Sequence, residues 1–493
     1  MTFIHRYNHL HGLNTQTSPF LLTPESLTIC NGVNPSYLVG GLLKDTGYVQ
    51  VGGVAEANNS ILGAFDFIQI PGTQKFLITM NNAADNATQL FYNNAGTWTE
   101  IGAAETAWTI ANANVEMESF IAHCFCVGHN GTDFLPVGSL TGTTFSTTAN
   151  VTDMAQGKYI KRYRDRLYVA NCRSGGTNYP FRVYFSSVPS AGVITWTPAS
   201  DFIDIGYSEE ITGLAVNWDL LIIFTKDRAY YYNQQTLKLL FTKGCTSHRT
   251  IKNLGSIMMW GNRDGDFMSR NGGEPQNVAG QVLDFIRNAN TQLSFSEMID
   301  EEYHHYLGNV TVNGLAYAKC MLTLNVPLMA WRTRELTHTM TIFAKYSDDT
   351  TADSNRLYMG DTTGKVFDKA KYTDTTVYQA DGCVSTVSDG TAIASLFELA
   401  PFVVDPENFK ALTQIVSYTE RAGGLKLLYR IVDGSTRDIA KYQPITQLTS
   451  FINEAKISAS QGQMIQIAGT EVGKDPYWKY FGTSYDLIPT GKP

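Results

Sequence analysis

The sequence predicts an all-β protein, in which a β-propeller-like domain of six or seven irregular blades lies between an N-terminal arm and a C-terminal β domain. The composition and a recurring pair of strands carry this prediction. The 493-residue chain is 43% hydrophobic and 12% aromatic but only 17% charged. It is rich in Tyr, Phe, Thr, Asn and Gly, which is typical of β structure with many polar turns.

A short apolar strand, a tight polar turn and a second, aromatic-rich strand recur along the chain. The clearest copy runs from Asn217 to Phe224, turns at Thr225–Arg228 and returns through Ala229–Asn233. Asp-Gly, Asn-Gly and Thr-Gly steps in other copies supply the positive φ that tight hairpins need. Those copies lie at residues 76–92, 124–131, 165–185, 256–269, 310–314 and 356–367.

The spacing of these units indicates how the chain is divided. Successive turn centres are roughly 35 to 55 residues apart, which brackets a four-stranded propeller blade of about 40 to 50 residues. We therefore expect the propeller over residues 57–375, with a pair of irregular β-sandwiches as the alternative. Residues 1–56 lack sustained periodicity and are expected to form an arm that wraps a neighbour or supplies a closing strand. Residues 376–493 lose the hairpin period but keep strand-like runs, so we expect a separate β domain there.

One short helix is expected in the propeller region. Val282, Phe285, Ile286 and Ala289 follow the i, i+3, i+4, i+7 spacing of an amphipathic helix. The run is too short for a helical domain, so we expect an insertion between two blades.

Charge and targeting signals restrict the protein's partners. Lys and Arg number 37 against 45 Asp and Glu, so the net charge of −8 repels a polyanion on average and argues against a sequence-reading DNA binder. The seven cysteines are scattered and odd in number, so we expect reduced, buried side chains rather than a disulfide framework. A signal peptide and a membrane-spanning segment are not expected. Synthesis in the cytoplasm follows from these features.

Patterns of enzyme chemistry fail in this sequence. A nucleophile elbow is absent, and Gly360–Val366 misses the phosphate-binding loop in spacing and lacks its Ser or Thr, so we interpret it as a hairpin turn. Gly96–Trp98 and Gly192–Trp196 show only the tail of the sialidase repeat. We therefore expect no catalytic residues and no cofactor.

Two clusters could hold a metal in principle. Glu302 and His304 would share one face of a strand, although a solvated β edge is the favoured interpretation of residues 300–305. Cys124 and Cys126 also share a strand face, but no second cysteine pair completes a zinc site, so a core location is favoured. No metal site is expected.

The densest basic stretch interleaves cations with tyrosines, as surfaces that follow a nucleic-acid backbone do. Its candidate contacts with a DNA channel or with another subunit are Lys158, Lys161, Arg162, Arg164 and Arg166. The alternative is a solvated blade rim that forms salt bridges with a neighbouring acidic subunit.

The order of several motifs resembles that of one group of proteins. The step into the blade at Tyr163–Tyr184 is rich in arginine, with Arg162, Arg164 and Arg166. Ile211–Tyr232 contains a Trp-Asp hairpin, and Gly244–Asn253, Gln276–Arg287 and Leu357–Phe367 follow in turn. In this order the chain is similar to the tail accessory, or DNA-stabilisation, hub and nozzle proteins of short-tailed bacteriophages. The likeness spans about residues 55–435.

The resemblance implies a structural protein of the virion tail without an active site. Such proteins assemble as a ring, commonly a homohexamer, below the portal and adaptor, extend the DNA channel, and retain the packaged DNA until ejection. Expected partners are the portal-adaptor complex, other tail proteins such as fibres or a tail plug, and transiting DNA by non-specific contact. The rival hypothesis is a carbohydrate-binding or depolymerising propeller at the tail tip, where Tyr230, Tyr231 and Tyr232 would stack on sugars.

Overall fold

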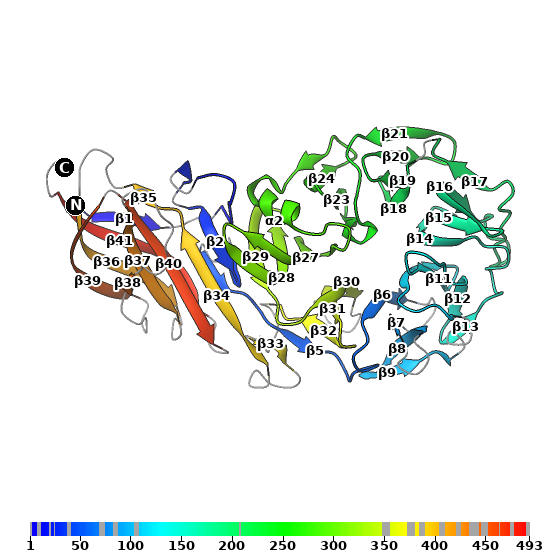
Figure 1. The fold of residues 1–493 in the computed structure, drawn as a ribbon, viewed down its shortest axis with the longest axis horizontal. Coiled ribbons are helices and arrows are strands. Elements are labelled where there is room, and N and C mark those ends of the chain that lie inside the picture. The colour runs from blue at the N-terminus through cyan, green and yellow to red at the C-terminus, as the bar shows by residue number, and fades with distance from the viewer. Residues whose placement is uncertain are drawn as a thin grey trace.

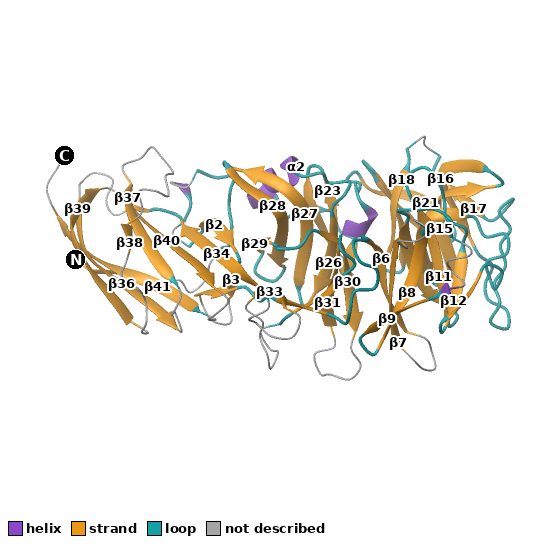
Figure 2. Cartoon of the chain, turned by 60° about the horizontal axis from the view of Figure 1, so that its bottom comes forward, coloured by secondary structure: helices purple, strands orange, loops and turns teal. Residues whose placement is uncertain are grey.

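The structure is a computed structural model that confirms the all-β, propeller-type fold. The residues that it describes are 2–6, 11–18, 21–23, 25–36, 41–68, 74–81, 87–102, 108–206, 209–347, 355–371, 380–383, 390–403, 410–420, 425–432, 443–444, 452–462, 464–473 and 478–489. Seven four-stranded antiparallel blades follow one another around a ring, and a further β unit extends from one side of it (Figures 1 and 2). Within the described ranges, no helix is long and apolar enough to cross a membrane.

Five of the blades are separate sheets whose strands pair in sequence order. Blade 1 holds β6 (Ile61–Ile68), β7 (Gln74–Asn81), β8 (Thr88–Asn94) and β9 (Thr97–Glu100). Blade 2 holds β10 (Asn114–Phe120), β11 (His123–His129), β12 (Gly138–Thr141) and β13 (Thr144–Ser146). Blade 3 holds β14 (Gln156–Tyr163), β15 (Arg166–Ser174), β16 (Thr177–Phe185) and β17 (Phe202–Asp204). Blade 4 holds β18 (Ile211–Asn217), β19 (Leu220–Thr225), β20 (Ala229–Tyr232) and β21 (Leu237–Phe241). Blade 5 holds β22 (Lys252–Leu254), β23 (Ile257–Asn262), β24 (Gly265–Arg270) and β25 (Gln276–Asn277).

The last two blades belong to a larger sheet and close the ring. Blade 6 holds β26 (Phe295–Ile299), β27 (Glu302–Val312), β28 (Leu315–Asn325) and β29 (Ala330–Glu335). Blade 7 holds β30 (Met340–Ser347), β31 (Asn355–Asp361), β32 (Val366–Lys369) and, from the N-terminal segment, β5 (Tyr48–Gln50). β30 packs against β6, so the last blade meets the first.

Short helices lie in the connections between blades. The 3-10 helix η2 (His248–Thr250) joins blades 4 and 5. Between blades 5 and 6 lie the 3-10 helix η3 (Gly280–Val282) and α2 (Leu283–Asn288), where Val282, Phe285 and Ile286 are buried. The helix expected from the apolar spacing is thus confirmed as an insertion between blades.

The clearest predicted hairpin is present, but its first boundary was wrong. β19 and β20 pair with Phe224 opposite Ala229, as expected. Trp218 and Asp219, assigned from sequence to the strand, instead form a two-residue turn with φ of 50° and 56°. Positive φ at both positions gives the turn twist that matches the flanking strands. The Trp218 indole donates a hydrogen bond to the Ser256 carbonyl at 2.9 Å, so tertiary contact holds a bulky residue in this turn.

Apolar clusters between adjacent blades form most of the propeller core. Cys124 and Cys126 lie in the cluster between blades 1 and 2, with Leu77 and Leu140. All seven cysteines are buried and free, as the sequence predicted. Burial raises the pKa of Cys245 to about 12, against smaller opposing hydrogen bonds, so this thiol stays protonated at neutral pH.

A two-sheet β unit adjoins the propeller, on the side of blades 6 and 7 (Figure 1). One sheet contains β1 (Thr2–Arg6), β3 (Val33–Ser36), β4 (Gly41–Lys44), β36 (Lys410–Glu420), β39 (Ile452–Gly462) and β41 (Lys479–Pro489). The other contains β2 (Leu27–Asn31), β33 (Ala380–Cys383), β34 (Thr391–Leu399), β35 (Phe402–Val403), β37 (Lys426–Val432), β38 (Gln443–Pro444) and β40 (Met464–Gly473). The predicted strand runs after residue 376 correspond to β36 and β37.

The N-terminal segment connects the two units rather than standing apart from them. β2 pairs with β34 of the outer unit and, through Asn31 and Thr333, with β29 of blade 6. β5 pairs with β32 on one side and with β33 on the other. Of the two expected roles for this segment, the supply of a closing strand is the one seen within the chain. The predicted boundaries at residues 56 and 375 stay predictions.

A buried ionic cluster lies where the two units meet. Arg334 of β29 forms ion pairs with Asp381 of β33 and, at 3.3 Å, with Asp45, which follows β4. Asp45 also faces Lys369 of β32, at 3.5 Å. All four side chains are buried. Burial alone would raise the pKa of Asp45, but the charges of Lys369 and Arg334 outweigh it and hold the pKa below its usual range.

Residues 302–305 lie inside a blade rather than at the solvated β edge that the sequence indicated, whereas Asp300 and Glu301 are exposed in the turn before β27. β27 is the second strand of blade 6, so both of its neighbours cover it, and His304 is 3% exposed. Glu302 receives two hydrogen bonds of 2.7 Å from Arg332 and lies 3.6 Å from His304. Burial lowers the pKa of His304 to about 3, against the opposing charge of Glu302. Strand order, which the sequence does not show, decides this burial.

Replacing Arg334 by Met is expected to lower the free energy of unfolding by about 3 kcal/mol or more, because two buried carboxylates would lose a cation. Urea unfolding followed by tryptophan fluorescence measures the change. Arg263→Met is the control, because Arg263 is 63% exposed and its ion pair with Asp264 is long at 3.9 Å. Its free energy of unfolding should stay within about 0.5 kcal/mol of the native value. Adding Asp381→Asn to Arg334→Met should restore part of the loss. An unchanged unfolding midpoint for Arg334→Met would contradict a stabilising role for the cluster.

Candidate functional site

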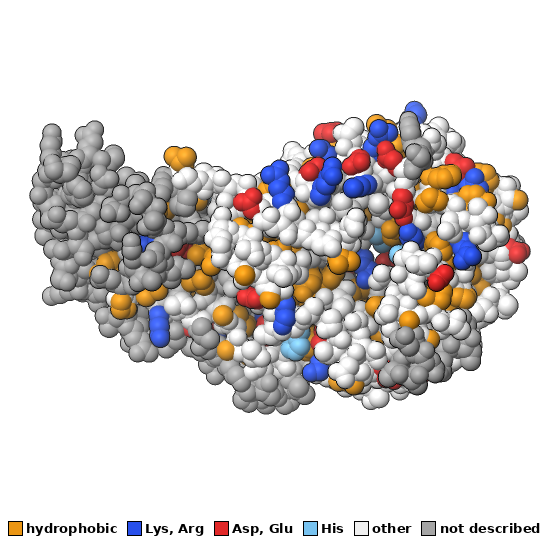
Figure 3. All heavy atoms as spheres, in the orientation of Figure 1, with side chains coloured by type: hydrophobic (Ala, Val, Ile, Leu, Met, Phe, Trp, Pro, Cys, Tyr) orange, Lys and Arg blue, Asp and Glu red, His pale blue; other side chains and the backbone are white. Residues whose placement is uncertain are grey.

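The propeller axis contains two cavities that together mark a divided central channel. The larger has a volume of about 680 Å³ and the smaller about 400 Å³. The inner strands β6, β10, β14, β26 and β30 line the larger cavity with their early residues and the smaller one with later residues. The space-filling view shows basic and histidine side chains at the hollow in the middle of the propeller (Figure 3).

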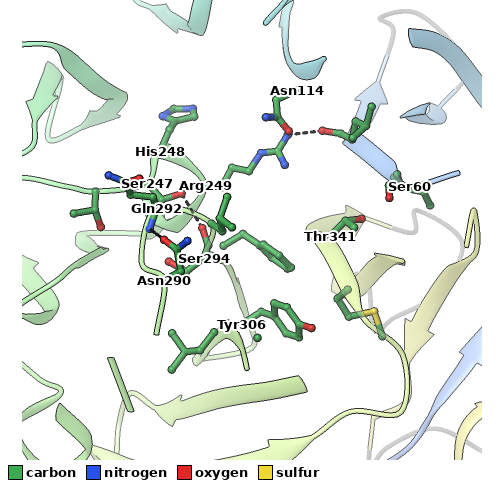
Figure 4. Close-up of a pocket in the computed structure, with 18 of the residues that line it drawn as sticks. Ser60, Asn114, Ser247, His248, Arg249, Asn290, Gln292, Ser294, Tyr306 and Thr341 are labelled. Carbon is green, nitrogen blue, oxygen red and sulfur yellow. Dashed lines mark hydrogen bonds between the residues drawn. The ribbon is translucent and has the colours of Figure 1, made fainter. Parts of the chain in front are cut away.

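Three charged or titratable side chains separate the cavities, because they line both of them. They are Glu116 of β10, His248 of η2 and its neighbour Arg249. Glu116 lies 3.5 Å from the His248 Nε2 and 3.5 Å from the Arg249 Nε. Arg249 also donates a hydrogen bond to the Leu62 carbonyl, across the channel in blade 1 (Figure 4). We call Glu116, His248 and Arg249 the partition.

Neighbouring blades hold the partition in place. The Leu214 N–H donates to the His248 Nδ1 at 3.3 Å, which leaves the Nε2 proton to face Glu116. Gly213 makes room for this ring, since a Cβ there would lie 3.1 Å from the His248 Nδ1 and 2.6 Å from Ile251. On the other side, the Ser247 hydroxyl donates to the Ser294 carbonyl at 2.7 Å. The loop into blade 5 is therefore fixed from blades 4 and 6.

The partition remains charged at neutral pH but internally compensated. Burial alone would raise the pKa of Glu116, but its interaction and hydrogen bond with His248 and the charges of Arg249 and Lys161 outweigh it, and the pKa lies well below its usual range. Burial lowers the pKa of His248, although Glu116 opposes the shift. We therefore assign an Arg249–Glu116 ion pair beside a neutral imidazole.

The five basic residues singled out from the sequence do not form one surface. Lys158 lines the larger cavity and Lys161 the smaller one. Lys158 pairs with Glu210 at 2.6 Å and Lys161 with Glu118 at 3.3 Å. These acidic partners belong to the same chain, whereas the sequence alternative assumed a neighbouring subunit.

The three arginines lie at or beside the turn between β14 and β15. Arg164 forms a two-pronged ion pair with Asp219, at 3.0 and 2.5 Å. Arg162 lies over the Phe120 ring, and Arg166 over the Phe185 ring, at 5.3 and 5.2 Å to the centroids. Within the described part of the chain neither of these two has a carboxylate partner, so their charges are uncompensated.

The remaining candidates from sequence have structural positions. Tyr230 is buried, and Tyr230 and Tyr232 pack into the cluster between blades 3 and 4, so the three tyrosines form no common platform. Gly360–Val366 is the predicted hairpin turn, with the Asp361 carboxylate accepting the N–H groups of Thr363 and Lys365. Among the residues described, no group of three or more His, Cys, Asp or Glu side chains is placed to hold a metal ion.

The sequence alone did not indicate the partition or the larger cavity. The one available signal was the segment around His248 and Arg249. It is a ten-residue connection between two strands, and it carries charged side chains. Its partners, Glu116 and Leu62, lie more than 130 residues earlier in the chain. Groups this far apart in the sequence come together only when the blades close into the propeller.

The chain was compared with protein families, curated proteins and solved structures. No family model and no curated protein matches the chain. Among solved structures, it is similar to BBS1N from the complex with ARL6DN, at 9% identity and a TM-score of 0.39, over 67% of this chain and 98% of that one.

Two bacterial surface proteins are also similar. PorZ, an essential surface component of the type-IX secretion system of Porphyromonas gingivalis, matches at 10% identity and a TM-score of 0.38, over 71% of this chain and 45% of PorZ. The extracellular domain of a one-component system from B. thetaiotaomicron matches at 11% identity and a TM-score of 0.41, over 93% and 61%. The chain thus spans less than two thirds of both.

Replacing Lys158 by Met is expected to raise the pKa of His129, which also lines the larger cavity. Burial and then the charges of Lys158 and Arg249 lower this pKa to about 4, since nearby cations disfavour the imidazolium. Removing one cation therefore moves the titration upward. Nuclear magnetic resonance of protein with ¹⁵N-labelled histidines would measure it. Lys345→Met, at an exposed residue of the smaller cavity, should leave His129 unchanged. An identical His129 titration in Lys158→Met and the native protein would refute this electrostatic description.

Proposed function

We propose that this protein is a non-enzymatic structural subunit of a short-tailed bacteriophage tail. In this proposal it forms a hub or nozzle ring, commonly a hexamer, below the portal and adaptor, where it extends the DNA channel and retains the packaged DNA until ejection. The order of motifs in the sequence and the propeller fold both agree with this role, although propellers serve many functions.

The observation that carries the proposal is the junction between the propeller and the outer β unit, which paired strands and buried ion pairs connect. A tail ring bears the internal pressure of the packaged genome, so its subunits must transmit force without bending between domains. Here β2 and β5 make the sheets of both units continuous, and the Arg334–Asp45–Asp381 ion pairs are buried between them. A buried network with good geometry resists separation, because parting the units would leave unpaired charges.

The partition supports a channel formed between subunits rather than through one of them. Glu116 and Arg249 divide the propeller axis into cavities of about 680 and 400 Å³, and Arg249 is bonded to the opposite wall. A DNA duplex cannot pass through such a space. If DNA passes this protein, several copies must enclose it.

Arg162 and Arg166 are the best candidates for contact with transiting DNA or a neighbouring subunit. Lys158, Lys161 and Arg164 already pair with carboxylates of the same chain, which reduces their attraction for phosphate. A net charge of −8 with a few uncompensated arginines favours weak, transient contact, as a conduit requires.

The rival tail-tip hypothesis expected Tyr230, Tyr231 and Tyr232 to stack on sugars, but Tyr230 and Tyr232 are packed between blades. Three tyrosines on one strand therefore give no stacking surface for sugars. Any sugar site would have to lie elsewhere in the molecule.

Assembly tests the proposed function directly. The native mass of the purified protein is measured by light scattering, alone and with candidate portal and adaptor proteins. We expect about six copies to join a portal-adaptor complex in a fixed ratio. A protein that stays monomeric and binds neither component would contradict the proposal.

Replacing Arg162 and Arg166 by Ser in the assembled ring is expected to weaken its non-specific affinity for duplex DNA. Loss of two phosphate contacts should reduce the slope of log affinity against log salt by about 1.8. Fluorescence anisotropy at several salt concentrations gives the slope. The matched control is Arg263→Ser with Arg270→Ser, two exposed arginines of blade 5, and should retain the native slope. Equal slopes for both double variants would exclude Arg162 and Arg166 as DNA contacts.

A further inference from the structure

The larger cavity has a lining that points to a ligand, whether or not the protein assembles into a multi-subunit ring. Its rim carries the side-chain amides of Asn114, Gln292 and Asn309, which come from blade 2, the connection before blade 6, and blade 6 itself (Figure 4 labels the first two). All three residues are exposed, and within the described residues their side chains have no hydrogen-bond partner. Each amide offers both a donor and an acceptor.

The wall of this cavity is aromatic. Phe295 and Tyr306, which are only 4% and 5% exposed, stack with ring centroids 4.9 Å apart and an interplanar angle of 23° and line the base of the cavity. Tyr159 lines the cavity from blade 3. Leu293, which is 75% exposed, adds an apolar group at the mouth. Apolar walls with a few placed polar groups are the usual lining of small-ligand sites, and the volume lies in their ordinary range.

The charged side chains that line the cavity already have partners within the chain. Lys158 contacts Glu210 at 2.6 Å, and Glu210 also receives a hydrogen bond from Asn171 at 2.7 Å. Arg249 is held by Glu116 and the Leu62 carbonyl. A charged ligand group entering here would have to break one of these pairs or remain unpaired in the inner part of the cavity, and both are unfavourable.

The partition closes the cavity at its inner end, so a polymer would enter by its terminus rather than run through. A peptide terminus carries an ammonium or a carboxylate, and a nucleic-acid chain carries phosphates. The non-reducing end of a neutral glycan is uncharged, and it presents hydroxyls to amides and C–H groups to aromatic side chains. The chemistry of the lining therefore favours a saccharide over the other two.

We propose that the larger cavity binds the uncharged non-reducing end of a glycan. Asn114 and Gln292 hydrogen-bond its hydroxyl groups, and the stacked Phe295 and Tyr306 rings form the apolar wall of the site. The Arg249–Glu116 pair is the floor that limits entry to the terminal sugars.

The experiment applies the full-length protein to an array of immobilised glycans that differ in their terminal sugar. Neutral ends such as glucose, galactose, mannose and N-acetylglucosamine are compared with glucuronic and sialic acid ends, and with peptides whose termini are free. We expect binding to one or more neutral ends, and none to acidic ends or peptides. No glycan binding, binding to acidic ends alone, or preferential binding of peptides overturns the proposal.

Variants connect any binding to this cavity. Loss of each amide should weaken binding about fivefold, so Asn114→Leu with Gln292→Leu should weaken it about 25-fold. Asn178→Leu is the matched control, because Asn178 is an exposed amide of β16 that does not line the cavity, and it should bind as the native protein does. Thermal unfolding of each variant verifies the fold, and each single variant is measured as well. Native affinity in the folded double variant would place the glycan elsewhere and overturn the assignment.

Discussion

The architecture depends on balanced charge at the junction between the propeller and the outer β unit. Arg334 lies between two buried carboxylates, Asp45 and Asp381, and Lys369 supplies the second cation. An ion buried without a partner costs several kcal/mol. The strands that carry these groups come from the N-terminal segment, blades 6 and 7 and the region after residue 376, so they are stable only when all of them are assembled.

This constraint explains the unusual use of the N-terminal residues. Strand β5 completes blade 7 and at the same time pairs with β33 of the outer unit, while β2 bridges blade 6 to β34. A propeller blade that ended at β32 would expose an edge to further pairing. Here that edge is covered by the chain's own beginning, and the covering strands bring Asp45 to Arg334. Ring closure, edge protection and the ionic cluster are thus one structural arrangement.

Buried charges are also paired along the propeller axis, and this pairing places DNA contact and ligand binding at different parts of the protein. The Arg249–Glu116 pair closes the axis, so transport of DNA is assigned to a lumen between subunits, where Arg162 and Arg166 keep uncompensated charge. The larger cavity, whose charges are all compensated, is assigned to a neutral ligand. A ring subunit that also binds glycans would combine a DNA conduit with attachment to a cell surface. Ring assembly and glycan binding are tested independently, so disproof of one leaves the other standing.

The sequence by itself determined the fold class and most of the hairpins, because strand alternation and Asp-Gly or Asn-Gly turns depend on residues that are close along the chain. It also predicted buried cysteines, the helix near Phe285 and the hairpin at Gly364. Where tertiary contact overrides local preference, the prediction failed, as at Trp218 and at the buried His304. The closing strand β5, the partition around Arg249 and the pairing of Lys158 with Glu210 were decided by the tertiary structure, because closure of the ring brings together groups whose order along the chain carries no record of their contact.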